Sequence, residues 1–194
     1  MKNLIKIILL KKEAIFELLF CFIACGIFGW FYETIFVLIQ TGAMTDRGIL
    51  FISYIGNFPI IWGFPFILVY GVGGALLILI FKPLAKKPIL LFVVGLISMT
   101  VLEYMTALLC ETFLHQKLWD YSDKFMNLQG RISLFTSFMW GLLSLLAVKV
   151  FAPGCHILYG KFKNKHVLHI LIGLIVIYII VCYILRPTLY PGMV

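Results

Sequence analysis

Two glutamates, Glu33 and Glu103, lie inside long apolar stretches of this 194-residue sequence. A carboxylate at membrane depth costs on the order of 2.5–3.5 kcal/mol on insertion scales unless it is paired, neutralised or hydrated. Helices that only pack in lipid have no need of such a group, so an acid retained there predicts a functional site. A carboxyl group whose pKa is raised by burial can act as a general acid or base.

Further polar side chains occur near the ends of the same stretches. Arg47 and Arg131 are each followed by apolar residues (RGIL and RISL), so each is placed to reach into the membrane interior. Arginine suits a dry setting because its planar fork matches a carboxylate or phosphate through two hydrogen bonds. The candidate polar cluster contains the two glutamates, the two arginines and six further residues: Tyr104, Glu111, Trp119, Asp120, Tyr121 and Asn127.

Structural roles compete with a binding role for several of these residues. A Glu–Arg pair between helices can simply fix their packing, and Glu111 lies near the interface, where an acid can merely be exposed. Trp119 and Tyr121 fit aromatic anchors at the membrane interface better than they fit ligands. Asp120 fits a solvated or capping position, because an aspartate at a loop–helix junction satisfies backbone amides. The two intramembrane glutamates are the hardest to explain in this way.

Other chemistry finds little support in the sequence. The five cysteines form no CxxC pair, and Cys155-His156 has no partner at the spacing of a metal site. The phosphate-binding pattern GxxxxGK[ST] is absent, so an ATPase of the chain's own is not expected. We therefore expect neither a metal nor another cofactor.

Composition assigns the chain to the integral membrane proteins. Apolar residues make up 63% of it, charged residues only 12%, and the mean hydropathy is +1.09. A soluble domain carries about 25% charged residues. The net charge of +8 comes from lysines grouped at the ends of apolar stretches, which is typical of membrane anchoring and not of nucleic-acid binding.

Five stretches are long enough to cross a hydrocarbon core, which takes about 20 helical residues. We predict a single all-α polytopic domain over residues 1–194, with helices at about 14–40, 58–81, 89–114, 132–151 and 167–185. The second helix is interrupted by proline and glycine, so a re-entrant or broken segment is expected before it. Residues 1–12 form a short basic segment that is expected to lie along the inner surface of the membrane.

Basic residues favour one orientation in the cell membrane. With the N-terminus in the cytoplasm and the C-terminus outside, eleven of the sixteen lysines and arginines lie inside and five outside. The positive-inside rule prefers that arrangement. The candidate polar cluster then falls in the outer half of the bundle or at its rim.

Helical periodicity predicts two faces of functional or packing interest. At about 100° per residue, related positions recur every three or four residues. Small residues on such a face let helices approach closely in lipid, and a packing seam is the simpler explanation of the serines. One face lies on the first helix (Gly26, Gly29, Trp30 and Glu33) and the other on the fourth (Ser133, Ser137, Trp140 and Ser144).

Several short motifs make the chain resemble the CmpB-like family, labelled as ABC-transporter type IV permeases and related to small animal transmembrane proteins. The matching pieces are GWFYE (29–33), DRGIL (46–50), the proline/glycine stretch at 58–63, LEYMTALLCETF (102–113), LWDYS (118–122) and NLQGRISLFTSFMWG (127–141). They cover about residues 28–145, and FISYIGNFPIIWG departs from the family's usual GPxxPIYG. By this resemblance, the residues carried over are those of the candidate polar cluster together with Trp30, Gly48, Gly130 and Trp140.

Three classes of function follow from these observations. The leading hypothesis is a transporter or permease-like subunit with a polar site in the outer half of the bundle. The alternatives are a membrane-embedded enzyme acting on lipid headgroups at the outer leaflet, and a scaffold or assembly protein. The partners left open, besides the lipid bilayer, are a separate ATPase, another membrane subunit and a second copy of the chain.

Overall fold

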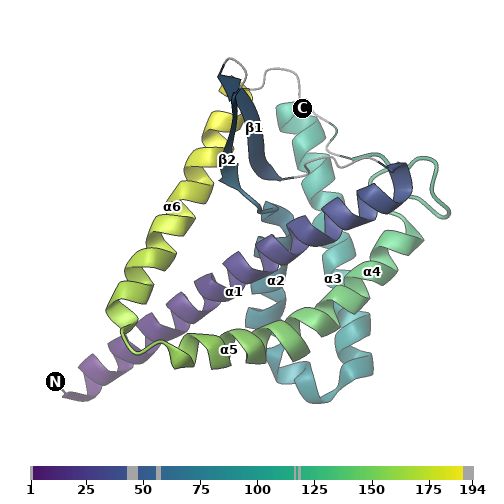
Figure 1. Ribbon diagram of the computed structural model, residues 1–194. Helices are drawn as coiled ribbons and strands as arrows, with labels where there is room; N and C mark the ends of the chain where they lie inside the picture. The colour runs from purple at the N-terminus through teal and green to yellow at the C-terminus, as the bar shows by residue number, and fades with distance from the viewer. Residues whose placement is uncertain (1, 43–47, 56–57, 116, 118, 190–194) are drawn as a thin grey trace. The chain divides into compact units, whose positions relative to one another are not determined.

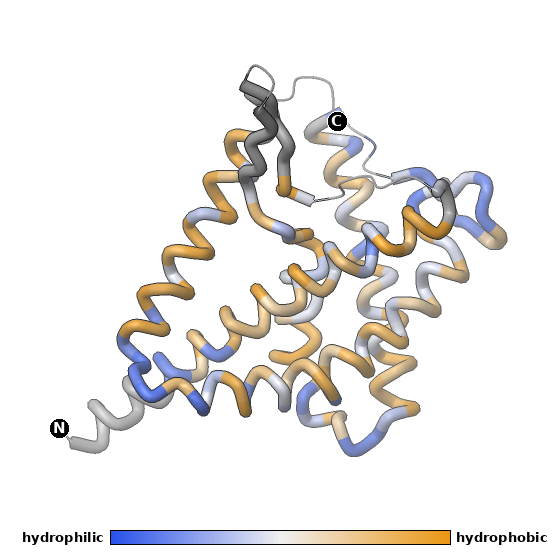
Figure 2. The backbone as a smooth tube through the Cα atoms, in the orientation of Figure 1, coloured by the Kyte–Doolittle hydropathy of each residue, from blue (hydrophilic) through white to orange (hydrophobic). Residues whose placement is uncertain are grey.

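The computed structural model describes residues 2–42, 48–55, 58–115, 117 and 119–189 (Figure 1). Five helical segments are long and apolar enough to cross a membrane, as the sequence predicts. Hydrophobic residues line most of their length, and hydrophilic residues gather at the turns between them (Figure 2). The spans are Lys11–Ile39, Leu68–Lys86, Pro88–Phe113, Leu134–Lys161 and Lys165–Leu185.

The helices differ from the predicted ranges mainly at their ends. They are α1 (Lys2–Thr41), α2 (Leu68–Phe81), α3 (Pro88–Leu109), α4 (Leu134–Leu146), α5 (Ala152–Lys161) and α6 (Lys165–Leu189). A 3₁₀ turn, η1 (Lys82–Lys86), follows α2, and π-helical turns η2 (Cys110–Leu114) and η3 (Ala147–Phe151) follow α3 and α4. The segment at 1–12, expected along the inner surface, belongs to α1 from residue 2 onward, and its place relative to the membrane stays a prediction.

A β-hairpin replaces the first part of the predicted second helix. Strand β1 (Ile49–Ile55) pairs antiparallel with β2 (Phe58–Phe64), so the helix expected from residue 58 begins only at Leu68. Proline lacks the amide hydrogen that a helix interior needs, and Pro59 and Pro65 flank Gly63, whose φ is +96°. Their backbone preferences favour a hairpin followed by a break.

The hairpin lies beside the C-terminal half of α6 (Figure 1). The Gly63 amide donates to the hydroxyl of Tyr178 (3.1 Å), and the Leu68 amide donates to the hydroxyl of Tyr183 (2.9 Å). Two tyrosines of α6 thus bind the backbone at the end of β2 and at the start of α2.

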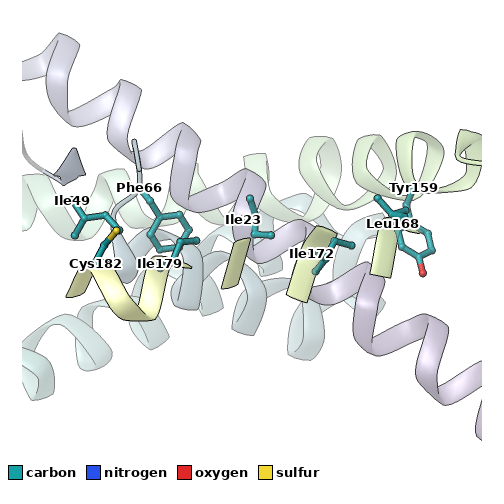
Figure 3. Packing of buried hydrophobic residues seen from close by; sticks show 8 residues of the cluster. All are labelled: Ile23, Ile49, Phe66, Tyr159, Leu168, Ile172, Ile179 and Cys182. Carbon is teal, nitrogen blue, oxygen red and sulfur yellow. The ribbon is translucent and has the colours of Figure 1, made fainter. Parts of the chain in front are cut away.

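The chain forms two compact units. One unit comprises residues 1–76 and 151–191, and the other comprises residues 77–150 and 192–194. In the first unit, buried side chains from α1, β1, α5 and α6 pack together around Phe66 (Figure 3). They are Ile23, Ile49, Phe66, Tyr159, Leu168, Ile172, Ile179 and Cys182.

Small residues bring α1 close to the start of α2 in the first unit. A Cβ atom at Gly26 would lie 1.9 Å from the Phe66 ring, and one at Gly29 would lie 2.2 Å from the Tyr70 ring. The amide of Ile67 also donates to the carbonyl of Gly26 (3.1 Å). Two glycines of the predicted α1 face therefore form a packing surface.

The second unit is built on close packing of α3 against α4. A Cβ atom at Gly95 would lie 2.2 Å from the Ser144 hydroxyl, and one at Gly141 would lie 2.5 Å from the Phe92 ring. Ser144 is fully buried and donates its hydroxyl to the Trp140 carbonyl (2.7 Å). The predicted serine face of the fourth helix is accordingly a packing seam.

Candidate functional site

Glu103 is the buried acid of the second unit. It lies six residues before the end of α3 and is only 5% exposed. The hydroxyl of Tyr121 donates to its Oε1 atom over 3.2 Å. Tyr121 belongs to the loop between η2 and α4, so this loop folds back far enough to reach an acid on the helix.

Hydrogen bonds within that loop hold Tyr121 in place. Its amide donates to the Gly130 carbonyl (2.8 Å), and the Trp119 indole donates to the Arg131 carbonyl (2.8 Å). The Asn127 side chain accepts from the Gly130 amide (3.1 Å) and donates to two loop carbonyls. Gly130 has a φ of +70°, and a Cβ atom there would lie 2.5 Å from the Ser122 hydroxyl. A side chain at position 130 would therefore disturb the loop.

Arg131 connects the end of this loop to α3 and η2. Its Nε and Nη2 atoms both donate to Oε2 of Glu111, over 3.0 and 2.6 Å. Its Nη1 atom donates to the Tyr104 hydroxyl (3.3 Å) and to the Gln129 side chain. Of the five N–H groups of a guanidinium, four therefore have partners within the protein. Both donors to Glu111 meet a single oxygen, so the pair is not a two-oxygen fork.

The charged groups of this region are mutually compensated. The hydrogen bonds that Arg131 donates to Glu111 raise the pKa of Arg131, which keeps its positive charge firmly in place. Asp120 receives hydrogen bonds from Lys117 (2.6 Å) and from the Ser122 amide (2.9 Å). These contacts hold the pKa of Asp120 well below its usual value, with the bond from Lys117 the largest cause. Asp120 thus shapes the loop by binding its own backbone, which is the structural alternative considered for it.

Glu33 is the corresponding acid of the first unit. The hydroxyl of Tyr70 donates to its Oε1 atom over 2.5 Å. Tyr70 is brought within reach because its ring packs against Gly29, one turn before Glu33 on α1. Both intramembrane glutamates therefore accept a hydrogen bond from a tyrosine hydroxyl.

The predicted cluster divides between the two units. Glu33 belongs to the first, while Glu103, Tyr104, Glu111 and the loop residues belong to the second. Arg47 lies outside the described residues. A shared interior for the two glutamates remains a prediction.

Sequence reasoning missed Tyr70 and Gln129. The available signal for Tyr70 was a hydroxyl-bearing ring in an apolar, glycine-rich stretch, and for Gln129 a position two residues before Arg131. Among the described residues, no group of three or more His, Cys, Asp and Glu side chains lies close enough to hold a metal.

A helical chain with five spans and polar contacts near their ends defines a multi-pass membrane protein. The chain belongs to the family described as "Putative ABC-transporter type IV", whose model matches residues 20–185. This confirms the resemblance and extends it through most of α6, which the motifs at 28–145 did not reach. No curated protein and no solved structure matches the chain.

Proposed function

We propose that the chain is a transport-related membrane subunit and that the Glu103–Tyr121 pair belongs to its polar solute site. The observation that carries this proposal is the placement of Tyr121, because a loop residue reaches a buried acid within an apolar helix. Intramembrane acids of this kind mark ion or substrate pathways in transporters. Membership of a transporter family supports the same reading.

The arrangement argues against Arg131 as an anion clamp for lipid headgroups. Four of its five donors are already engaged, so an anionic ligand that takes two hydrogen bonds from Arg131 would have to displace Glu111, Tyr104 or Gln129. Arg131 instead fixes the end of the loop that carries Tyr121. An outer-leaflet enzyme would therefore need a different group to bind its substrate, which leaves transport as the better-supported function.

A transport site must be reachable by water, and this can be tested without knowing the solute. Met99 and Ala107 lie one turn on either side of Glu103 and are buried with it on the same helix face. Val101 lies on the opposite face of the helix, is 58% exposed, and serves as the matched control. Single cysteines at these positions, in a background lacking the native cysteines, are treated with a charged, membrane-impermeant thiosulfonate.

We expect the reagent to modify Ala107→Cys and Met99→Cys while sparing Val101→Cys in the lipid. If neither buried position reacts, although a cysteine at the loop residue Lys124 does, the core is filled and the role is structural. A third outcome is that the charged reagent modifies none of the three cysteines, whereas a lipid-phase maleimide modifies Ala107→Cys. That outcome would instead indicate a lateral opening to lipid.

A further inference from the structure

Three helix ends meet in the first unit around Tyr159. The Tyr159 hydroxyl donates to Oε2 of Glu13 near the start of the α1 span (2.7 Å), and it lies 2.6 Å from Nε2 of His169 in α6. His169 is stacked on Phe16 of α1 with ring centroids 3.9 Å apart. Tyr159 and His169 are only 4% and 7% exposed. The start of the α1 span, the end of α5 and the start of α6 are thus joined by buried contacts.

Lysines lie close along the chain to the residues of this junction. Four exposed lysines lie within four residues of Glu13 or Tyr159 along the chain: Lys11, Lys12, Lys161 and Lys163. None of the four forms an ion pair within the described part of the chain. Lys165 lies over the Tyr159 ring, 3.6 Å from its centroid. Hydrophilic residues gather at the turn between α5 and α6, beside the apolar Phe162 (Figure 2).

The acids of the junction leave this charge largely uncompensated. Glu13 binds Tyr159, and Glu17 lies 3.0 Å from Nδ1 of His156. Five lysines against these two glutamates leave three positive charges when the histidines are neutral. The amino end of α6 adds a partial positive charge at the same place, because the positive end of a helix dipole lies at the N-terminus of the helix. The junction is therefore an attractive site for an anion.

Apolar surface lies directly beside the lysines. Ile157 and Leu158 are 57% and 51% exposed, and Lys161 follows them by one helical turn on the same face of α5. Phe162 is exposed as well, at 47%. The opposite face of α5 is buried through Ala152, Cys155 and Tyr159. A ligand at this place meets cations and an apolar surface side by side.

We propose that the basic junction, defined by Lys11, Lys12, Lys161 and Lys163 around Tyr159, binds an anionic phospholipid. The headgroup phosphate lies among the lysines, and an acyl chain packs on Ile157 and Leu158. Basic pockets where membrane helices end are suited to anionic headgroups. The exposed apolar pair distinguishes this ligand from a free phosphate, which would use the lysines alone. The proposal does not depend on the transport function or on the orientation of the chain.

The test measures thermal stabilisation of the purified full chain in mild detergent. Dioleoyl phosphatidylglycerol is titrated against dioleoyl phosphatidylcholine, and glycerol 3-phosphate provides the headgroup chemistry without chains. We expect only phosphatidylglycerol to raise the unfolding temperature. Lys161→Ala/Lys163→Ala should weaken its apparent affinity about tenfold or more, since each lysine near a charged surface contributes appreciably.

A second double variant controls for net charge. Lys82→Ala/Lys86→Ala removes the same charge from the exposed turn η1 of the second unit and should leave the affinity within about twofold of wild type. Lys161→Arg/Lys163→Arg should retain binding because it keeps the cations. Equal losses in the two alanine doubles, or equal stabilisation by phosphatidylcholine or glycerol 3-phosphate, would overturn the proposal.

Discussion

At the scale of single residues, the two acids that first marked the sequence have the same kind of partner. Glu33 is bound by Tyr70 and Glu103 by Tyr121, so each carboxylate is held by a neutral hydroxyl donor. Each hydroxyl fixes the direction of the carboxylate that it binds, as the guanidinium of Arg131 does for Glu111. The sequence identified both acids because polar groups are rare in apolar stretches. It included Tyr121 in the candidate polar cluster but missed Tyr70, because a tyrosine in an apolar stretch fits lipid-facing and interfacial positions equally well.

Arg131 should act through its geometry more than through its charge. We expect Arg131→Lys to insert and fold but to lower the unfolding temperature by about 2–4 °C, the range expected for a modest loss in a chain of this size. A lysine reaches one partner, whereas the guanidinium binds Glu111, Tyr104 and Gln129 together. Differential scanning fluorimetry in detergent measures the shift.

Glu111→Gln provides the matched partner variant for this measurement. Its effect and that of Arg131→Lys should not add in the double variant, because both changes disrupt one contact. Wild-type stability for Arg131→Lys, together with unchanged accessibility of Ala107→Cys, would show that Arg131 is an ordinary interfacial charge.

The lowered pKa of Asp120 predicts a pH-dependent loop. The Asp120 carboxylate stabilises the loop fully above its unfolded pKa of about 3.9. That contribution declines below this pH and is lost as the pH falls through the lower pKa of the folded protein. Hydrogen exchange of the Ser122 amide, which donates to Asp120, should therefore be faster in Asp120→Asn than in wild type at neutral pH.

The same difference should disappear in strong acid, where wild type is protonated as well. Asp123→Asn is the control, because Asp123 is exposed and pairs with its neighbour Lys124. A protection difference for Asp120→Asn that persisted unchanged to the lowest pH would contradict an electrostatic origin.

At the scale of elements, hydropathy predicted five spans and failed at the hairpin. Long apolar stretches with helical length are unambiguous, and α3 departs from its predicted start by one residue. The stretch from Ile49 to Phe64 is also apolar, and short apolar runs do not distinguish strand from helix by periodicity. Its isoleucines and aromatic residues favour strands, but hydropathy gives them no separate weight. The fourth span was predicted to end at residue 151 but continues through α5 to Lys161, with Pro153 in the first turn of α5, where proline is tolerated.

Close packing between α3 and α4 predicts strict limits on residue size. Gly95→Ala should lower the free energy of unfolding by about 1–3 kcal/mol, the usual cost of overfilling a packed interface. A Cβ atom there meets the buried Ser144 hydroxyl, which has no space to retreat. Unfolding in a denaturing detergent titration measures the difference.

Gly173→Ala is the matched control in α6. No atom lies within 4 Å of a Cβ atom at that position, so its stability should equal or slightly exceed that of wild type. The double variant Gly95→Ala/Ser144→Gly should recover part of the loss, since it restores the missing space. Equal behaviour of the two alanine variants would mean that the seam is loose.

At the scale of the whole molecule, the distribution of lysine and arginine along the chain predicts one orientation in the membrane. With the N-terminus inside, the loop at 115–130 lies outside and the turns at 82–88 and 153–166 lie inside. The structure adds that much of the last segment is helical, because α5 continues to Lys161. The sequence had suggested only a loop there.

Cysteine labelling in intact cells tests this orientation. In a background lacking native cysteines, an impermeant maleimide should modify a cysteine at Lys124 and leave one at Lys86 untouched until the membrane is permeabilised. Both lysines are exposed side chains in described turns, so local burial does not bias the comparison. The reverse pattern would invert the assignment of every loop.

The π-helical turn η3 lies within one continuous helical span and changes the direction in which the later residues of that span point. A π turn accommodates one residue more than the α-helical path, which rotates everything beyond it by roughly 100°. Before it, Ser137, Trp140 and Ser144 are buried, and after it Ala152, Cys155 and Tyr159. The extra residue changes which side of the helix carries the buried residues, and the helix itself continues without a break. Removing a single residue within 147–151 would shift the register of α5 by one position and take Tyr159 out of line with Glu13 and His169.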